Sequence, residues 1–267
     1  MFSAFYSGKY EQSLEIFAAS DIGSTSQEDL HYAVAASAIL GRVDSQLVEA
    51  LPEPLTMAEF ASTLQQQIAA ETEQPLTGML VQPRYLHKTL LAAALGLEGG
   101  RPYFVETGTY IGHSLYQISG LFKHLWTVEA SPDLYRAASA LFSSRNITTV
   151  TLMQGNSIDL LRDLPADVMR NAVFFLDAHY SHGITSQEYG WCPLLQEIPM
   201  ILDVAPNALI VVDDLRTMSG INGYPTLEQL FGVLPSTARA QIAFDQLIIN
   251  PGSDSDWLRG LVQRLQP

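Results

Sequence analysis

FVETGTYIGHS, residues 104–114, is the stretch of sequence that decides the fold of this chain. An apolar run typical of a β-strand ends at Glu106, Gly108 and Gly112 follow, and an amphipathic segment begins at His113. Glycines let the backbone approach a ligand closely, and the N-terminus of a helix offers unpaired N–H groups. The stretch therefore predicts a strand, a tight turn and a helix that together hold a nucleotide-type cofactor.

The spacing of the two glycines narrows the choice of cofactor. A dinucleotide-binding turn has the pattern G-x-G-x-x-G, whereas this chain has E-x-G-x-x-x-G and places Tyr110 where the second glycine would stand. A dinucleotide pyrophosphate needs the closer backbone approach that glycine allows. The turn therefore favours a cofactor without a pyrophosphate.

From residue 101 onward, strand-like and helix-like segments alternate. The strand-like runs are 103–107, 125–129, 148–153, 172–177 and 208–213, and the helical stretches between them lie near 113–123, 132–143, 157–164 and 192–203. Such alternation predicts an α/β domain, a Rossmann-like, doubly wound sheet that is mostly parallel, with helices on both faces. After a helix near 226–233, the runs 239–244 and 246–250 predict an antiparallel terminal hairpin that completes seven strands, and 254–265 predicts a closing helix.

Residues 1–97 differ from this pattern and are expected to form a helical region that precedes the cofactor-binding domain, residues 98–267. Tyr6 to Phe17 has helical spacing, Ser26 is placed to cap a helix over 28–40, and Thr56 with Glu59 forms a capping box. A further helix is expected from Pro83 to Gly96. The first part resembles a degenerate tetratricopeptide helix pair, so the region is expected to act as a cap, a dimerisation element or such a repeat.

Composition excludes several classes of protein. Of the 267 residues 47% are hydrophobic, and none of the apolar runs approaches the roughly 18 residues of a membrane span. The single cysteine, Cys192, rules out an intrachain disulfide, so a cytoplasmic location is expected. The formal net charge of −14 disfavours nucleic acid as a partner and favours a small-molecule substrate.

Acidic residues end most of the predicted parallel strands. Glu106 ends the first, Glu129 the second, Asp177 the fourth, and Asp213 with Asp214 the fifth. Ligands of open α/β sheets bind outside the carboxyl ends of the strands, and buried carboxylates are rare unless they are paired. Glu129 also lies near the distance from the glycine turn at which an acidic side chain meets ribose hydroxyls.

Together these residues resemble the class I S-adenosylmethionine-dependent methyltransferases, most closely the catechol-type and macrocin-type O-methyltransferases. The resemblance covers about residues 101–250. It implies that the turn and the strand ends bind S-adenosylmethionine, with the methionine part against the turn, the ribose on Glu129 and the adenine near Asn156. The implied cofactor-binding residues are Glu106, Gly108, Tyr110, Gly112, Ser114, Glu129, Asn156, Ser157 and Asp177.

The resemblance also gives a meaning to the acidic residues after strands four and five. Asp177, Asp213 and Asp214 are expected to converge, because these strands are neighbours in the methyltransferase strand order. Three close carboxylates call for a cation, and oxygen ligands indicate Mg²⁺, with Ca²⁺ or Mn²⁺ as alternatives. In the alternative interpretation, Asp177 contacts cofactor or substrate directly and Asp213 is a buried capping group.

The polar stretch 178–191 follows Asp177 and supplies the candidate general bases His179 and His182. Catechol-type enzymes have a lysine in this region, and this stretch has none. The expected activity is transfer of a methyl group to a hydroxyl oxygen of a small molecule, assisted by a divalent metal, with Asp177 and a histidine as catalytic residues. The alternatives are metal-free O- or N-methylation with a histidine base, or an inactive cofactor-binding or protein-interaction module. A homodimer is a further expectation.

Overall fold

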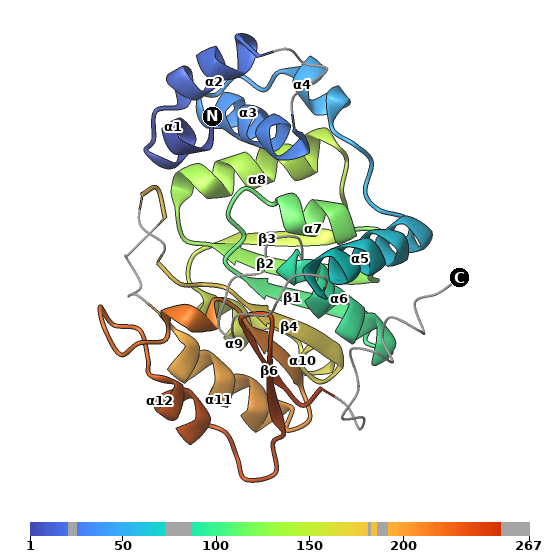
Figure 1. Ribbon diagram of the computed structural model, residues 1–267, viewed down its shortest axis with the longest axis vertical. Coiled ribbons are helices and arrows are strands. Elements are labelled where there is room, and N and C mark those ends of the chain that lie inside the picture. The colour runs from blue at the N-terminus through green and yellow to red at the C-terminus, as the bar shows by residue number, and fades with distance from the viewer. Residues whose placement is uncertain (21–25, 73–86, 181–182, 186–191, 252–267) are drawn as a thin grey trace.

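A twisted seven-stranded sheet forms the centre of the computed structural model, which describes residues 1–20, 26–72, 87–180, 183–185 and 192–251 (Figure 1). Its strand order is β3-β2-β1-β4-β5-β7-β6. The strands are β1 (Tyr103–Thr107), β2 (His124–Glu129), β3 (Val150–Gln154), β4 (Ala172–Leu176), β5 (Leu209–Val212), β6 (Ala240–Ala243) and β7 (Gln246–Ile249).

The pairing of the strands confirms the predicted fold. β1 pairs in parallel with both β2 and β4, β2 with β3, and β4 with β5. The terminal hairpin adds β7 antiparallel to β5 and β6 antiparallel to β7. This is the Rossmann-like methyltransferase fold. The chain reverses its direction of winding beside β1, so the carboxyl ends of β1, β2 and β4 border the crevice where ligands bind in such sheets.

Helices cover both faces of the sheet, as parallel strands require. One face packs against α6 (Lys88–Glu98), α7 (His113–Ile118) and α8 (Pro132–Ser144). The other face packs against α9 (Ser157–Asp163), α10 (Ala166–Asn171), α11 (Leu194–Val204) and α12 (Leu227–Gly232). Alternation along β5 illustrates the division, because Val211 joins the first core while Ile210 and Val212 join the second. The short helix α10 is absent from the sequence prediction.

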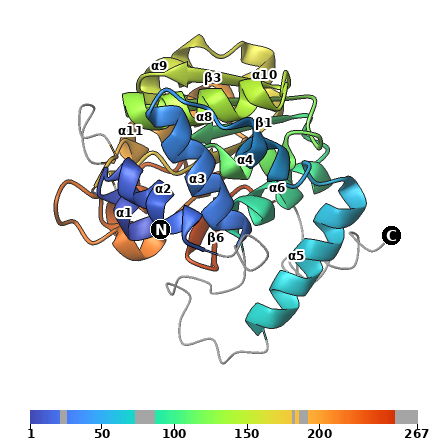
Figure 2. The same cartoon turned by 90° about the horizontal axis from the view of Figure 1, so that it is seen from above.

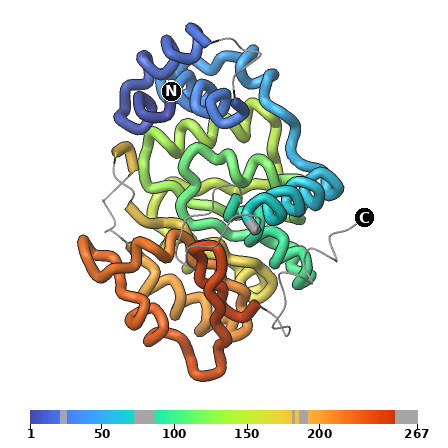
Figure 3. Tube along the Cα trace, viewed as in Figure 1, coloured from blue at the N-terminus to red at the C-terminus, as the bar shows by residue number. Residues whose placement is uncertain are grey.

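The predicted helical region forms a layer beyond α8. It comprises α1 (Phe2–Tyr6), α2 (Tyr10–Ala18), α3 (Gln27–Ile39), α4 (Ser45–Ala50) and α5 (Met57–Thr72). Helix α3 packs against α8, and α1 and α2 pack against α3, whereas α5 packs against α6 (Figures 1, 2 and 3). Helix α6 follows this region, and Lys88 in its first turn contacts Asp213 at the end of β5.

Local signals at the helix ends account for most of these boundaries. Ser26 accepts the backbone N–H of Asp29 at 3.1 Å, and Thr56 and Glu59 form the predicted reciprocal capping box. The residues with helical spacing from Tyr6 to Phe17 lie in two helices, α1 and α2. Gly8 has φ +73°, a left-handed conformation that ends α1 and turns the chain into α2.

Parts of the sequence prediction fall outside the described residues. These are the helix start at Pro83, the closing helix over 254–265 and much of the loop 178–191, including His182. The turn that follows β5 lies within the described residues and contains a short 3₁₀ helix, η2 (Leu215–Thr217). None of the helices in the described ranges has both the length and the apolar character needed to cross a membrane.

Candidate functional site

A cavity of about 770 Å³ opens at the carboxyl ends of β1, β2 and β4. Its size lies within the range of cavities that bind small molecules and cofactors. Eight of the nine predicted cofactor-binding residues line it, namely Glu106, Gly108, Tyr110, Ser114, Glu129, Asn156, Ser157 and Asp177. His179 and Asp214 line the same cavity, so the candidate metal and base residues share it with the candidate cofactor residues.

The glycine turn has the geometry that its sequence indicates. Gly108 has φ +89°, and a Cβ atom there would lie 2.6 Å from the backbone oxygen of Asp177. Gly112 has φ +79° and is the N-cap of α7, where a Cβ atom would lie 2.9 Å from the ring of Phe142 on α8. Both glycines are therefore required by close packing of the turn as well as by its backbone conformation. Gly112 is the predicted cofactor-binding residue that does not line the cavity, so its role is to shape the turn.

Glu129, at the end of β2, is anchored by the turn. Its Oε2 accepts the backbone N–H of Tyr110 at 2.8 Å, and its Oε1 accepts that of Ser131 at 2.8 Å. Burial raises the pKa of Glu129 to about 7, and the backbone N–H groups oppose that shift. Each carboxylate oxygen accepts more than one hydrogen bond. Glu129 can therefore fix the turn and still accept hydroxyl groups of a ligand in the cavity.

Glu106 is the most deeply buried acid of the cavity wall, with 3% of its surface exposed. Its Oε2 finds no hydrogen-bond partner among the described residues. Burial, and then the negative charges of Asp177 and Glu129, raise the pKa of Glu106 well above its ordinary value. Thr127 forms a hydrogen bond with this carboxyl group, but Oε2 is shielded from the cavity as well as unpartnered. The raised pKa therefore favours a neutral, protonated Glu106 in the cavity wall.

Asn156 has a clear structural role in addition to lining the cavity. It is the N-cap of α9, where its Oδ1 accepts the backbone N–H of Asp159 at 2.8 Å and its amide donates to the Asp159 carboxylate at 2.5 Å. Ser157 begins the helix and is buried. The N-terminus of α9 therefore lies at the cavity, and the Asn156 side chain that caps it is already hydrogen-bonded within the same helix.

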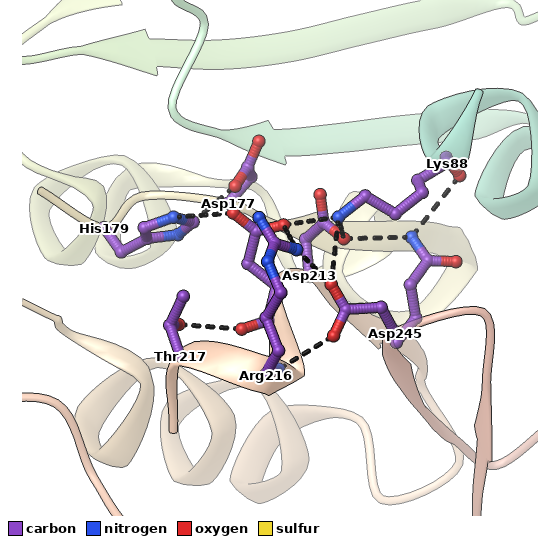
Figure 4. Close-up of polar contacts among 9 residues, drawn as sticks. Lys88, Asp177, His179, Asp213, Arg216, Thr217 and Asp245 are labelled. Carbon is purple, nitrogen blue, oxygen red and sulfur yellow. Dashed lines mark hydrogen bonds and ion pairs between the residues drawn. The ribbon is translucent and has the colours of Figure 1, made fainter. Parts of the chain in front are cut away.

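Three side chains around the end of β4 form a group that could hold a metal ion. Asp177, His179 and Asp214 each offer one ligand atom, and these atoms lie within 4.8 Å of one another. His179 stands between the two carboxylates, with Nδ1 at 3.3 Å from Asp177 and Nε2 at 3.2 Å from Asp214 (Figure 4). The sequence predicted Asp177, Asp213 and Asp214 as the metal ligands. In the structure His179 takes the place of Asp213 in this group.

Asp213 is instead paired with a lysine that sequence reasoning missed. Lys88, in the first turn of α6, lies 2.6 Å from Asp213 and also forms an ion pair with Asp214. Its side chain is only 11% exposed. Burial lowers the pKa of Lys88, but Asp213 and Asp214 outweigh this effect and raise it. Lys88 is therefore a fixed positive charge at the strand ends. The helical region thus supplies a lysine that the stretch 178–191 lacks.

The β6–β7 hairpin completes this charged cluster (Figure 4). Asp245, in its turn, is fully buried, has φ +66° and accepts the backbone N–H of Arg216 at 2.7 Å. The guanidinium of Arg216 contacts Asp245 and lies 2.6 Å from Asp214. The four carboxylates of the cluster face two permanent positive charges. With all four carboxylates ionised and His179 neutral, two negative charges would remain, which is the charge that a divalent cation would offset; without a cation, burial raises the pKa of Asp177 to about 8 and so favours its neutral form.

Of the two histidines predicted as bases, the structure describes His179. His182 lies outside the described residues. His179 has both ring nitrogens near carboxylates, and these carboxylates outweigh burial and raise the pKa of His179. Burial and the charge of Asp213 raise the pKa of Asp177, whereas His179 and Lys88 outweigh burial and lower that of Asp214. A proton on His179 and a cation at this group would therefore compete for the same carboxylates.

Comparison with known proteins gives likenesses of structure. No protein-family model and no curated protein sequence matches the chain. Among solved structures, the O-methyltransferase TomG from Streptomyces achromogenes in complex with SAM is 16% identical, with a TM-score of 0.43, over 78% of this chain and 94% of that one. The O-methyltransferase from Bacillus cereus in complex with SAH is 18% identical, with a TM-score of 0.43, over 77% and 94%.

A third similar structure is the SAH-bound methyltransferase PaMTH1 from Podospora anserina. It is 16% identical, with a TM-score of 0.41, over 77% of this chain and 92% of that one. Two of these three structures are named as O-methyltransferases and the third as a methyltransferase, and all three combine low sequence identity with high coverage. At these sequence identities the likeness is one of fold and does not extend to activity or substrate.

Proposed function

We propose that this protein is an S-adenosylmethionine-dependent methyltransferase that acts on a hydroxyl oxygen of a small molecule. The observation that carries the proposal is the joint placement, around one cavity, of the glycine turn, Glu129 and the Asp177–His179–Asp214 group. The two left-handed glycines fit a cofactor that lies against the turn. When bound, S-adenosylmethionine supplies a methyl group on a positively charged sulfur.

The chain's own residues would hold this cofactor in a defined way. Glu129 would accept the ribose hydroxyls while it keeps the backbone of Tyr110 and Ser131 in place. Ser157, Asn156 and the start of α9 would lie beside the adenine. Burial raises the pKa values of Glu106 and Asp177, and a cationic group beside them would favour their ionised forms. Methyl transfer is a displacement at the sulfonium, so the remaining task of the site is to orient the acceptor.

We further propose that Asp177, His179 and Asp214 hold a divalent cation, with Mg²⁺ or Mn²⁺ as the ions that suit carboxylate ligands. A bound cation lowers the pKa of an acceptor hydroxyl group that it contacts. Lys88 and Arg216 would keep Asp214 oriented from the other side. Asp213 would contribute through its charge and through its pair with Lys88.

Metal-free methylation is the second candidate, and one observation favours it. Lys88 and Arg216 already neutralise part of the cluster, and His179 lies between two carboxylates that could receive or orient a proton. In that case His179 would take the acceptor proton in its neutral form, which its raised pKa makes the less abundant form near neutral pH, and the acceptor could be an oxygen or a nitrogen. The region 1–97 would serve as a cap over the site in either mechanism.

The experiment that tests the proposal is calorimetry with S-adenosylhomocysteine, with NAD as the competing ligand. We expect S-adenosylhomocysteine to bind and NAD to give no heat. Glu129→Gln should weaken binding by on the order of 1.5–3 kcal/mol, because it removes charge-assisted hydrogen bonds. The exposed residue Glu15 gives the matched control, Glu15→Gln, which should bind as the wild type does. Binding of NAD with no binding of S-adenosylhomocysteine would overturn the proposal.

A further inference from the structure

One residue of the glycine turn has a backbone conformation that its side chain makes costly. Tyr110 has φ +53°, in the left-handed region that glycine enters readily and that a residue with a Cβ atom enters only at a cost in free energy. It stands where a dinucleotide-binding turn has its second glycine. Its backbone N–H donates to Glu129 at 2.8 Å, so its conformation sets the geometry of the turn. Such a conformation persists only where surrounding contacts hold it.

The contacts of the Tyr110 ring come from the helical region. This ring meets those of Phe5 in α1 and Tyr32 in α3 edge to face, with centroids 6.3 Å apart in both pairs. Phe5 is fully buried, and Tyr32 is 5% exposed. The next residue of the turn, Ile111, is buried in the same core together with Leu134 of α8. The turn is thus packed into a core to which α1 and α3 contribute.

The residue before Tyr32 contacts the other end of the turn. His31 of α3 lies against His113, the first residue of α7, with ring centroids 3.8 Å apart and ring planes at 86°. His31 is 2% exposed, and its Nδ1 donates to the backbone oxygen of Gln27 at 2.8 Å. Burial lowers the pKa of both His31 and His113, so the two rings meet as neutral groups. Their contact is therefore one of packing, with no charge to compensate.

Consecutive residues of one helix thus hold both ends of the turn. Neighbouring residues of an α-helix point about 100° apart around its axis, so one side of α3 can contact two points of a short turn. Helix α3 is anchored apart from the turn, because it packs along α8 and its last residue, Ile39, accepts a hydrogen bond from Arg136 at 3.0 Å. The turn therefore rests on a helix whose position is set by other contacts.

We infer that α3 acts as a clamp on the glycine turn, with Tyr32 and His31 as positioning residues that act through Tyr110 and His113. The clamp keeps Tyr110 in the left-handed conformation in which its N–H group meets Glu129. Without the clamp, Tyr110 relaxes toward an ordinary conformation, which withdraws that hydrogen bond and weakens cofactor binding. The inference rests on the proposed function where it concerns cofactor affinity, whereas the conformation of the turn is open to test without a ligand.

Two measurements on the full chain test the clamp. Calorimetry gives the affinity for S-adenosylhomocysteine, and hydrogen exchange followed by mass spectrometry gives the protection of the amides of residues 108–113 in the ligand-free protein. Tyr32→Leu and His31→Leu should each weaken S-adenosylhomocysteine binding at least fivefold and speed exchange in the turn at least tenfold. Tyr32→Phe keeps the ring and should stay within twofold of the wild type in both measurements.

Phe17→Leu is the matched control. Phe17 is a buried ring of α2, a helix that packs against α3, and it lies outside the core that contains Tyr110. Its replacement should lower the melting temperature as Tyr32→Leu does, yet leave cofactor affinity and exchange in the turn within twofold of the wild type. Equal effects of the two replacements on the turn would make general loss of stability the cause and overturn the inference.

Glycine in place of Tyr110 tests whether α3 acts through this residue. Glycine adopts a positive φ without strain and presents no ring to α3. In the Tyr110→Gly background, Tyr32→Leu should therefore change the affinity less than twofold. A further fivefold loss there, or wild-type affinity and exchange in both leucine variants, overturns the inference alone. A wild type that binds no S-adenosylhomocysteine overturns the proposed function, and the exchange measurements still decide for or against the clamp.

Discussion

Lys88, at the start of α6, forms an ion pair of 2.6 Å with Asp213, at the end of β5. The two residues are far apart in the sequence, and their pairing joins the helical region to the carboxyl edge of the sheet. Asp214 and Asp245 lie around the same ammonium group. The helical region is therefore a part of the site's electrostatics as well as a neighbour of the sheet.

Replacing Lys88 by methionine should lower the free energy of unfolding by about 3–5 kcal/mol, the usual effect of leaving one partner of a buried ion pair uncompensated. The double variant Lys88→Met/Asp213→Asn should recover part of this loss, because Asp213 is then neutral while Asp214 and Asp245 still lack the ammonium group. Urea denaturation of the wild type and the variants measures the difference. Lys123→Met, at an exposed lysine, is the control. A double variant as unstable as the single one would show that the pair itself is not the cause.

Local patterns were enough to predict the turn and the sheet. The run that ends at Glu106, the two glycines and the helix after them are adjacent in sequence, so their geometry follows from short-range rules. The alternation of apolar runs with helical segments then fixed the parallel order, and parallel order brings Glu129, Asp177 and Asp214 to one edge. Strand boundaries agree within about two residues of the structure because apolar runs mark them.

The partners of those acids could not be predicted in the same way. Lys88, Arg216 and Asp245 reach the cluster from a helix, a 3₁₀ turn and a hairpin turn, and their convergence depends on how these elements pack. Tyr32 and His31 look like ordinary core residues of a helix until the packing of α3 against the turn is known. A lysine that begins a helix is a weak signal. An aspartate in the one-residue gap between the predicted β-runs 239–244 and 246–250 is a stronger signal, because such a turn seldom needs a buried charge.

Alanine at Gly108 should be more damaging than alanine at Gly41, although both glycines have positive φ. Gly41 has φ +74° with open space around its Cα, so Gly41→Ala should cost about 1–2 kcal/mol of stability for the backbone conformation alone. Gly108→Ala adds a clash with the Asp177 backbone at 2.6 Å and should also weaken S-adenosylhomocysteine binding. Thermal denaturation and calorimetry on both variants separate the two effects. Equal losses of stability and unchanged binding would contradict this account of the turn.

Binding of Mn²⁺, followed by the loss of its free-ion electron paramagnetic resonance signal, tests the metal-binding group. His179→Ala, Asp177→Asn and Asp214→Asn should each weaken binding tenfold or more, because each removes one of the grouped ligand atoms. Asp213→Asn should have a smaller effect, since Asp213 faces Lys88. Asp203→Asn, at an exposed site on α11, is the matched control. If the wild type binds no Mn²⁺ and a chelator leaves methyl transfer unchanged, the metal-free mechanism replaces the metal-assisted one.

Glu197 gives the protein a pH-dependent stability that can be removed by one substitution. This residue of α11 is fully buried, and neither carboxyl oxygen has a hydrogen-bond partner of good geometry within the described structure. Burial raises the pKa of Glu197 to about 7, and nearby Ser157 and Thr107 only partly oppose it. The folded protein therefore keeps a proton here that the unfolded chain releases near its ordinary pKa of 4.5.

The sign of the effect follows from that difference. The stabilising contribution is fully present below about pH 4.5 and falls as the pH rises, until it is lost once Glu197 ionises in the folded protein near pH 7. Each step of one in pKa corresponds to about 1.4 kcal/mol, so the total fall is at most about 3 kcal/mol. Glu197→Gln keeps the shape and removes the titration. Its free energy of unfolding should exceed that of the wild type at pH 8 and change less between pH 5 and 8.

Urea denaturation at a series of pH values measures both slopes. Glu49→Gln, at an exposed glutamate of α4, should leave the wild-type slope unchanged, because that carboxyl group stays in water. The comparison uses the difference between the two glutamine variants, since Glu129 titrates in the same range and contributes equally to both. A Glu197→Gln slope equal to that of Glu49→Gln would mean that Glu197 ionises in the folded protein at an ordinary pH. A cation or a water molecule would then have to compensate its charge behind the cavity wall.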